Sequence, residues 1–179
     1  AGDAAGSGRL GEELTVSPEE NVRKGNMELE PIGIIHTPYA TKKEAPIQGI
    51  FQPDGEGRIE VYPQYAEGLK DIEGFSHIYL LYLFDRAGEI KLVRPTFLDD
   101  EAHGLFACRH PCRPNGIGMT VVRLLERDGN ELRVGGIDVL DGTPLIDIKP
   151  YIQRFDCFPE ASEGWVAARK ERPKPAGRE

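Results

Sequence analysis

The sequence predicts a mainly β protein, a small and mostly antiparallel β-barrel with one or two peripheral helices. Eight short apolar or alternating runs between residues 32 and 148 leave little room for helices. The chain has 21 Gly and 14 Pro among 179 residues, an excess that is typical of many turns between short strands. Because an open sheet of this size exposes two edges, we expect it to close on itself.

The strand candidates are runs of β-branched, aromatic and aliphatic residues broken by Gly, Pro and Asp. In chain order they span residues 32–36, 59–62, 78–84, 90–93, 105–108, 120–125, 132–139 and 145–148. Asp128-Gly129 lies between two of these runs and predicts a hairpin, because a type I′ turn requires positive φ.

One helix is predicted after Pro63, which is followed by apolar residues at four- and three-residue spacing. These apolar residues are Tyr65, Leu69 and Ile72.

Three regions are expected along the chain. Residues 1–26 lack apolar periodicity and read as a disordered leader or a tag-like extension, with Met27 as a natural start. Residues 27–158 contain all the strand candidates and form the barrel domain. Residues 159–179 carry Trp165 and then mostly basic residues, which predicts a short helix and a solvated tail.

Composition limits the functional classes. The net charge of −8 excludes a protein that coats nucleic acid indiscriminately. No apolar run approaches the ~18 residues of a membrane span, so a soluble protein without membrane contact is expected. Three cysteines are an odd number, which favours a reducing compartment and a cytoplasmic location.

A cationic segment interrupts this acidic chain. Residues 102–125 contain no Asp or Glu but contain Arg109, Arg113 and Arg123. Within them, residues 113–118 (RPNGIG) are expected to join two strands, with proline for rigidity and glycine for close approach of a ligand. A dinucleotide-binding loop is excluded, because the third glycine position is Val121 and a β-branched strand follows.

Metal binding is the weaker interpretation of Cys108, His110 and Cys112. Zinc sites use such ligands, but this cluster has no second half, and Cys157 stands alone. We therefore expect thiols without a metal and assign no metal ligand; a redox role of this cluster stays open.

Residues 138–151 are the second informative segment (DVLDGTPLIDIKPY). Asp141-Gly142 before Thr143-Pro144 has the pattern of a turn, so Asp141 either caps that turn or serves a site. Asp147 and Lys149 share one strand face, where they form a surface ion pair or border a cleft.

At these two segments together the sequence resembles the TsaA-like family, also called the TrmO family, of tRNA methyltransferases that depend on S-adenosylmethionine (SAM). The matching stretches are 31–38 (PIGIIHTP), 45–49 (APIQG), 74–78 (GFSHI), 104–107 (GLFA), Arg109 with 113–118 (RPNGIG), 140–144 (LDGTP) and 147–151 (DIKPY).

The resemblance implies a barrel methyltransferase without a Rossmann fold, acting as a homodimer on the anticodon loop of tRNA. It implies methylation of the exocyclic amine of threonylcarbamoyladenosine beside the anticodon. It also implies a set of SAM-binding residues: Pro46, Ile47, Gln48, Asp85, Arg86, Arg109, Met119, Val139, Leu140, Asp141 and Gly142.

Physical roles follow for these residues. Arg109 suits the methionine carboxylate, Asp141 or Asp85 suits the ribose hydroxyls or an amine, and Met119 with barrel-facing aliphatic residues suits the adenine. Asp141 and Lys149 are the catalytic candidates, as proton acceptor and as anchor of a carboxylate or phosphate. The expected substrate-binding residues are Arg113, Asn115, Lys149 and Tyr151.

The sequence also departs from the family pattern. Gly116 replaces a proline, and His110, Pro111 and Cys112 occupy positions where relatives often carry small residues. The chain resembles the short form of the family, without an extra C-terminal domain. The alternatives are a SAM-dependent methyltransferase of a small molecule or protein, and a SAM-binding module without catalysis.

Overall fold

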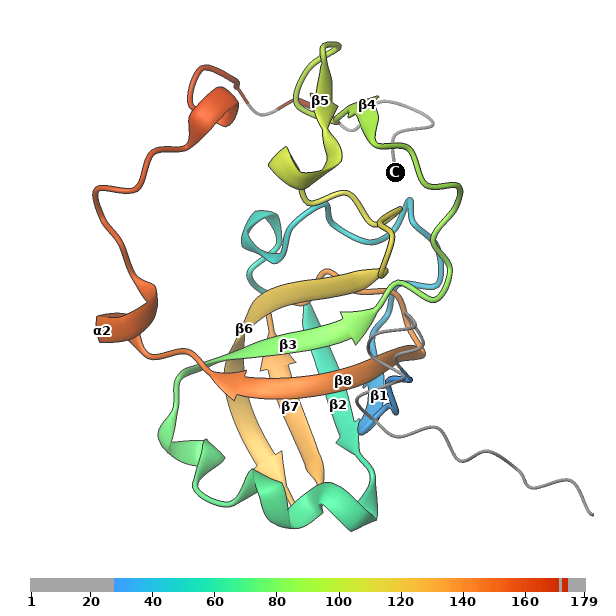
Figure 1. Cartoon of the computed structure of the whole chain (residues 1–179). Coiled ribbons are helices and arrows are strands. Elements are labelled where there is room, and N and C mark those ends of the chain that lie inside the picture. The colour runs from blue at the N-terminus through green and yellow to red at the C-terminus, as the bar shows by residue number, and fades with distance from the viewer. Residues whose placement is uncertain (1–27, 171, 174–179) are drawn as a thin grey trace, which may run out of the picture.

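The computed structural model describes residues 28–170 and 172–173 and shows a closed barrel (Figure 1). Six antiparallel strands pair in the order β1-β2-β7-β6-β3-β8, and β8 pairs with β1 to close the barrel. This confirms the predicted fold class. The strands are β1 (Gly33–His36), β2 (Glu56–Val61), β3 (His77–Leu83), β6 (Ile117–Asp128), β7 (Glu131–Gly135) and β8 (Thr143–Pro150).

The barrel interior is filled by every second residue of each strand, as the period of a β-strand requires. On β6 the buried residues are Gly118, Thr120 and Val122, whereas the residues between them are exposed. A Cβ at Gly118 would lie 2.2 Å from the Tyr82 ring, so glycine is needed where that ring fills the core. Burial of each large aliphatic side chain contributes about 1.5–3 kcal/mol. The fully buried aliphatic residues are Ile35, Ile59, Val61, Ile78, Leu80, Leu105, Val122, Leu132, Val134, Ile137 and Leu145.

The turn between β6 and β7 confirms the predicted hairpin, with Gly129 at φ 58°. The strand predicted over 132–139 is shorter than expected and ends at Gly135. Gly136 follows at φ 77°, and its N–H bonds to the carbonyl of Gly55 instead of continuing the ladder.

A second sheet of two strands lies outside the barrel, formed by β4 (Val93–Pro95) and β5 (Ala102–Gly104). The strand predicted over 90–93 is therefore mostly wrong, because Ile90 and Leu92 are exposed and lie outside any strand, and only Val93 belongs to β4. The strand predicted over 105–108 is also wrong: Leu105–Ala107 form the 3₁₀ helix η4, closed by a bond from Cys108 N–H to the Leu105 carbonyl. A short apolar run cannot distinguish these two structures. The 113–118 connector thus leads from η4, not from a strand, into β6.

Among the described residues, helical structure is limited to short turns. The helix predicted after Pro63 is two 3₁₀ helices, η2 (Pro63–Leu69) and η3 (Ile72–Gly74), separated by Asp71 at φ 67°. The remaining helical elements are η1 (Gly49–Phe51), α2 (Gln153–Asp156) and η5 (Gly164–Val166). No helix in the described part of the chain combines the length and hydropathy needed to cross a membrane.

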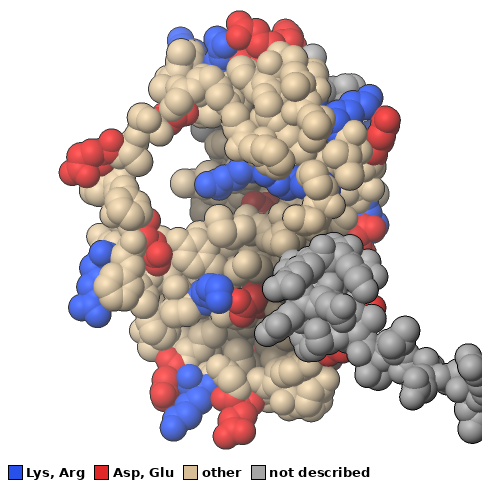
Figure 2. Space-filling view, in the orientation of Figure 1, with Lys and Arg blue, Asp and Glu red and all other residues tan. Residues whose placement is uncertain are grey.

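The C-terminal segment leaves β8 through α2, runs away from the barrel and returns to the β4–β5 sheet (Figure 1). Residues 157–164 are all exposed along this path, and Figure 2 shows an open gap between the segment and the body of the protein. Trp165 then stacks on His103 at 3.8 Å between ring centroids and donates to the Ala107 carbonyl at 2.9 Å. The predicted leader, residues 1–26, and residues 171 and 174–179 of the predicted tail lie outside the described residues.

Candidate functional site

The Asp141 turn lies just before β8 and is held by the segment that follows the neighbouring strand β1. Asp141 Oδ1 accepts the Thr37 N–H at 3.0 Å, and the Thr37 hydroxyl donates to the Val139 carbonyl at 2.9 Å. The Asp141 N–H bonds to the Tyr39 carbonyl, and Gly142 takes φ 74°. The turn predicted at Asp141-Gly142 is therefore present. The Asp141 carboxylate accepts the backbone N–H of Thr37 and still remains about half exposed, with side-chain exposure of 52%.

Arg86 connects the end of β3 to the same turn. Its guanidinium donates to the Asp141 carbonyl and to the Thr143 hydroxyl, both at 2.8 Å, and to Asp85 at 3.1 Å. A planar guanidinium can satisfy several acceptors in one fixed geometry. The Asp85-Arg86 pair and the residues 139–142 are thus brought together, as the resemblance implies for one site.

Gln48 and Arg109 meet from two further loops. Arg109 Nη1 donates to Gln48 Oε1 at 3.1 Å, and the Gly49 N–H donates to Asp138 Oδ2 at 3.0 Å. A Cβ at Gly49 would lie 1.9 Å from the carbonyl oxygen of Gly136, the residue after β7. Only glycine at position 49 allows the two backbones to approach this closely. Four segments that are distant in sequence therefore converge at one end of the barrel.

Asp138 and Tyr39 are buried polar residues that the sequence analysis did not select. Asp138 Oδ1 and the Tyr39 hydroxyl oxygen are buried and have no hydrogen-bond partner among the described residues. Burial raises the pKa of Asp138, and bonds from Thr120 and Gly49 together with the Arg109 charge oppose that rise. The sequence signal that could have identified Asp138 is an aspartate inside the apolar run Ile137–Leu140, because a buried carboxylate usually has a specific partner.

The expected substrate residues are not all at this end. The Arg113 side chain stabilises its own loop, because its Nη1 donates to the carbonyls of Cys108 and Leu105 at 2.9 and 3.2 Å. Asn115 is exposed in the turn before β6. Lys149 and Tyr151 lie at the opposite end of β8 from Asp141, about 20 Å or more along a strand that rises ~3.3 Å per residue. Lys149 there forms an ion pair with Asp147 at 2.7 Å, which was the first of the two alternatives for these residues.

Met119 projects outward from β6, with an exposed fraction of 51%. It does not share the barrel interior with the aliphatic residues that were expected to accompany it. Its neighbours on the outer face, Ile117 and Val121, are exposed by 41% and 40%, and β3 beside it presents Leu81 in register with Met119. The surface in front of the barrel is mostly uncharged in Figure 2.

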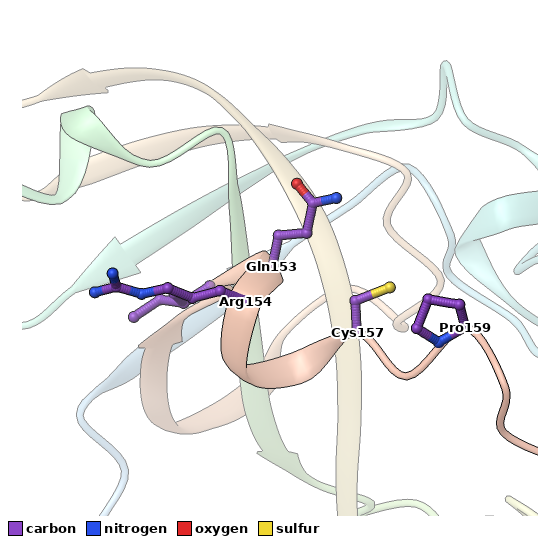
Figure 3. Close-up of a pocket in the computed structure, with 5 residues that line it drawn as sticks. Gln153, Arg154, Cys157 and Pro159 are labelled. Carbon is purple, nitrogen blue, oxygen red and sulfur yellow. The ribbon is translucent and has the colours of Figure 1, made fainter.

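Two hollows lie outside the cluster formed by Gln48, Arg86, Arg109 and Asp141. One, of about 570 Å³, is open to solvent and lies beside α2, where the side chains of Gln153 and Cys157 line it with Pro159 (Figure 3). The other, of about 290 Å³, lies between Thr37 and Arg133 near the Asp141 turn. Both hollows are shallow and open, whereas the converging hydrogen bonds lie at the end of the barrel that bears the Asp141 turn.

Cys108, His110 and Cys112 do not form a metal-ligand cluster in the described part of the chain. The Cys108 thiol lies 3.3 Å from the Leu105 carbonyl oxygen, and His110 Nδ1 accepts the Cys112 N–H at 3.1 Å. A different trio, Asp99, Glu101 and His103, has ligand atoms within 4.8 Å of one another. Arg169 already pairs with Asp99 at 2.7 Å and with Glu101 at 3.2 Å, so a protein cation lies at this position.

The sequence of this chain is similar to those of known proteins. Residues 34–157 match the family model described as the tRNA-methyltransferase O N-terminal domain. A probable S-adenosyl-L-methionine-binding protein of Pyrococcus abyssi is 53% identical over 136 residues, which cover 76% of this chain and 74% of that protein. The tRNA (adenine(37)-N6)-methyltransferase of Escherichia coli is 35% identical over 151 residues, covering 79% of this chain and 64% of that enzyme.

Solved structures show the same fold. A crystal structure of TrmO aligns with a TM-score of 0.68 at 39% identity, covering 77% of this chain and 63% of the crystallised one. The structure of TrmO from Pseudomonas aeruginosa aligns with a TM-score of 0.66 at 37% identity, over 78% of this chain and 62% of that one. The chain thus spans somewhat less than two thirds of these longer relatives.

Proposed function

Because this chain belongs to the tRNA-methyltransferase O N-terminal domain family, we propose that it is a SAM-dependent methyltransferase that modifies the exocyclic amine of an adenosine in tRNA. The observation that carries the proposal is the convergence of Gln48, Arg86, Arg109 and the Asp141 turn at one end of the barrel. These are positions that the resemblance assigns to SAM, and they come from four separate segments. A cytoplasmic location is part of the proposal, since the substrate is tRNA.

The residues at this end fit SAM by their chemistry. Arg109 offers an exposed guanidinium, held by a single bond to Gln48, to a carboxylate. Asp138 Oδ1 is an acceptor that lacks a donor, and SAM carries donors in its ammonium, ribose hydroxyl and adenine amine groups. The Val139 to Gly142 turn, fixed by Thr37 and Arg86, would hold the cofactor beside Asp141.

The chain's own residues would act by position and by proton transfer. SAM supplies a methyl group on a positively charged sulfur, which a nucleophile can take directly. An exocyclic amine conjugated to a purine is a poor nucleophile, so alignment of the two reactants accounts for much of the acceleration. Asp141 is half exposed and anchored by Thr37, which leaves carboxylate lone pairs free to accept the amine proton.

The finer substrate assignment is threonylcarbamoyladenosine beside the anticodon. This base carries a carboxylate on its threonine, and Lys149 and Tyr151 are the candidates to hold it. Within one protomer these two residues are at the wrong end of β8. They could serve the site only from a second protomer.

We also propose a homodimer formed through the outer face of β6 and β3. Ile117, Met119 and Val121 form an exposed apolar row there, and exposed contiguous apolar surface marks an interaction site. A two-fold axis that lies in this interface and crosses the strands at a right angle would place the β8 end that bears Lys149 against the partner's Asp141 turn, because such an axis reverses the strand direction between the two protomers.

One experiment tests the activity. The protein is incubated with SAM and with tRNA that carries or lacks the threonylcarbamoyl group, and the nucleosides are analysed by mass spectrometry. We expect a gain of one methyl group on the modified adenosine alone. Methylation of both tRNAs would reject threonylcarbamoyladenosine as the specific substrate. If neither tRNA is methylated while a thermal shift assay shows that SAM still binds, tRNA is rejected as the acceptor, in favour of another substrate or of a binding module without catalysis.

A further inference from the structure

His36 connects the proposed proton acceptor, Asp141, to a second carboxylate. β1 ends at His36, and its register with β2 places Arg58 opposite His36 and Glu60 opposite Ile34. Diagonal neighbours on one face of an antiparallel pair are within reach of long side chains, and His36 Nε2 lies 3.2 Å from Glu60 Oε2. The other ring nitrogen, Nδ1, lies 3.7 Å from Asp141 Oδ1. The imidazole therefore stands between two carboxylates.

The bond to Glu60 determines which ring nitrogen of His36 carries the proton. An ionised carboxylate only accepts hydrogen bonds, so Nε2 is the donor. In the neutral imidazole Nδ1 is then an acceptor, and its neighbour, Asp141 Oδ1, is an acceptor as well. Two acceptor atoms without a proton between them repel one another, and a proton taken up by Asp141 would remove that repulsion. The pair is thus arranged to share a proton.

The Asp141 carboxylate is able to pass a proton on. Oδ1 accepts the Thr37 N–H at 3.0 Å, which leaves Oδ2 for the amine proton of the substrate. The torsion of a carboxyl group about Cβ–Cγ is broad and roughly two-fold, so a half turn brings the protonated oxygen to His36 Nδ1 and the other oxygen to Thr37. The separation of 3.7 Å is longer than a hydrogen bond, but pairs that exchange protons are often long without substrate and tighten when it binds.

We propose that His36 is a positioning residue that takes the substrate's proton from Asp141 and releases it to water. The inference rests on the proposed function, in which Asp141 accepts the proton of the amine. First the amine N–H bond breaks, its electron pair stays on nitrogen, and an O–H bond forms on Asp141. That O–H bond then breaks as the Nδ1–H bond of His36 forms, which restores the carboxylate. The imidazolium loses this proton to water in the hollow of about 290 Å³ that His36 lines together with Thr37 and Arg58.

The charges around His36 favour the imidazolium that forms in the second step. Acidic residues outnumber arginines there, and two of the carboxylates flank the ring itself. The surrounding charged residues are Glu56, Arg58 and Glu60 on β2, Glu131 and Arg133 on β7, and Asp141 before β8.

The test measures methylation in a single turnover by His36→Gln, with His103→Gln as the matched control. His103 Nε2 also bonds to a carboxylate, that of Asp99 at 3.0 Å, but it lies on β5 outside the barrel. We expect His36→Gln to lower the rate about tenfold, less than the loss of a general base, because water also reaches the half-exposed Asp141. The Kd for SAM, measured by calorimetry, should not change, and His103→Gln should change neither quantity. Circular dichroism verifies that each variant is folded.

The pH profile of the rate separates this role from a merely structural one. A protonated His36 cannot accept a second proton on Nδ1, so the rate should fall at low pH where His36 titrates, and NMR follows that titration independently. His36→Gln should lose this part of the profile. In Glu60→Gln the amide oxygen still accepts the Nε2–H but a negative charge is lost, so the titration and the fall in rate should move together to lower pH.

Three results would overturn the proposal. One is an unchanged rate in His36→Gln, and another is a lower rate that keeps the pH profile of the unchanged protein, which indicates a structural effect alone. The third concerns the double variant. Because His36 acts through Asp141, His36→Gln should cost nothing further in an Asp141→Asn background, and an added loss there would contradict this.

Failure of the proposed function gives a different result. The NMR titration of His36 needs no substrate, and Asp141→Asn should move it to lower pH because one flanking charge is removed. That shift in a protein that never methylates tRNA would reject the proposed function and support the proton path for another acceptor. Full methylation by His36→Gln would do the reverse, and no shift in Asp141→Asn would reject the contact on which the path depends.

Discussion

At the scale of single residues, Asp141 combines a structural and a chemical task. One carboxylate oxygen accepts the Thr37 N–H at 3.0 Å, and His36 Nδ1 lies 3.7 Å from the same oxygen. The carboxylate is still about half exposed, with side-chain exposure of 52%. A residue that only capped the turn would be replaceable by asparagine, because the amide oxygen accepts the same bond.

The variant Asp141→Asn therefore separates the two tasks. We expect kcat for tRNA methylation to fall by about 10²- to 10⁴-fold, the usual contribution of a general base, while the Kd for SAM changes by less than tenfold. Single-turnover kinetics and calorimetry measure the two quantities. Asp54→Asn, at an exposed carboxylate before β2, is the control and should change neither; full turnover by Asp141→Asn would remove Asp141 as the proton acceptor.

His110 gives the protein a pH dependence of stability. Its pKa in the folded protein is lowered to about 4, below the ~6.5 of an unfolded histidine. Between these values the unfolded state binds more protons, so the free energy of unfolding falls as the pH is lowered from about 6.5 to 4. The stability is fully present above pH 6.5.

We expect His110→Gln to remove that part of the pH dependence. Because His110 is about half buried, solvent screening reduces the effect to about 1 kcal/mol across this range, which corresponds to roughly 2–4 °C in Tm for a chain of this size. Urea unfolding at pH 7.5, 6.0 and 4.5 measures it. An identical pH profile in His110→Gln and the unchanged protein would show that burial and the neighbouring positive charges do not lower the pKa of this imidazole.

At the scale of elements, the described part of the C-terminal segment beyond residue 164 is attached around the β4–β5 sheet. Residues 157–164 are exposed, whereas Trp165 stacks on His103 and donates to Ala107, and Arg169 pairs with Asp99. The segment is thus held by a few contacts on the β4–β5 sheet and not by the barrel core. Its opening should be a local event, separate from unfolding of the barrel.

Trp165→Ala is expected to open this segment. Loss of one aromatic stack and one hydrogen bond amounts to about 1.5 kcal/mol, which raises the rate of trypsin cleavage near Arg169 roughly tenfold under conditions where opening is fast. The Tm of the barrel should change little, because Trp165 is outside the core. Phe158→Ala, at an exposed aromatic residue of the same segment, serves as the control, and equal cleavage rates in the two variants would contradict the attachment.

At the scale of the whole molecule, the proposed site is divided between two ends of the barrel. Asp141, Arg86 and Arg109 are at one end, whereas Lys149 and Tyr151 follow the far end of β8. The apolar row on β6 lies between them. A homodimer would bring the two halves of the site together. Two variants that are each inactive could then complement one another, which is impossible if the whole site lies within one protomer.

Co-expression of Asp141→Asn with Lys149→Ala should restore activity that each variant lacks alone. Random pairing makes half of the dimers mixed, and each mixed dimer has one intact site of two, so about a quarter of full activity is expected for an isologous dimer. Val121→Glu, which places a charge in the apolar row, should give a monomer by light scattering and abolish the recovery. No recovery from co-expressed variants that still form dimers would place Lys149 outside the site.

Several strands could be predicted because one face of each is buried, and burial imposes a period of two on the sequence. The β6 pattern from Ile117 to Val122 is an example. Short apolar runs without that alternation were mispredicted: the run beginning at Leu105 is a 3₁₀ helix, and Ile90 is exposed and outside any strand. Their conformation depends on contacts with the rest of the chain, which periodicity does not record.

The sequence by itself determined the barrel class, the β6–β7 hairpin at Gly129, the turn at Asp141 and the family, because each depends on local periodicity, turn chemistry or short motifs. Only the tertiary structure decided which of these residues meet. Arg109 reaches Gln48 across 61 positions and Thr37 reaches Asp141 across 104, whereas Lys149, eight positions after Asp141, lies at the other end of its strand. The physical reason is that barrel closure fixes strand order and register, and distances between side chains follow from these and not from separation along the chain.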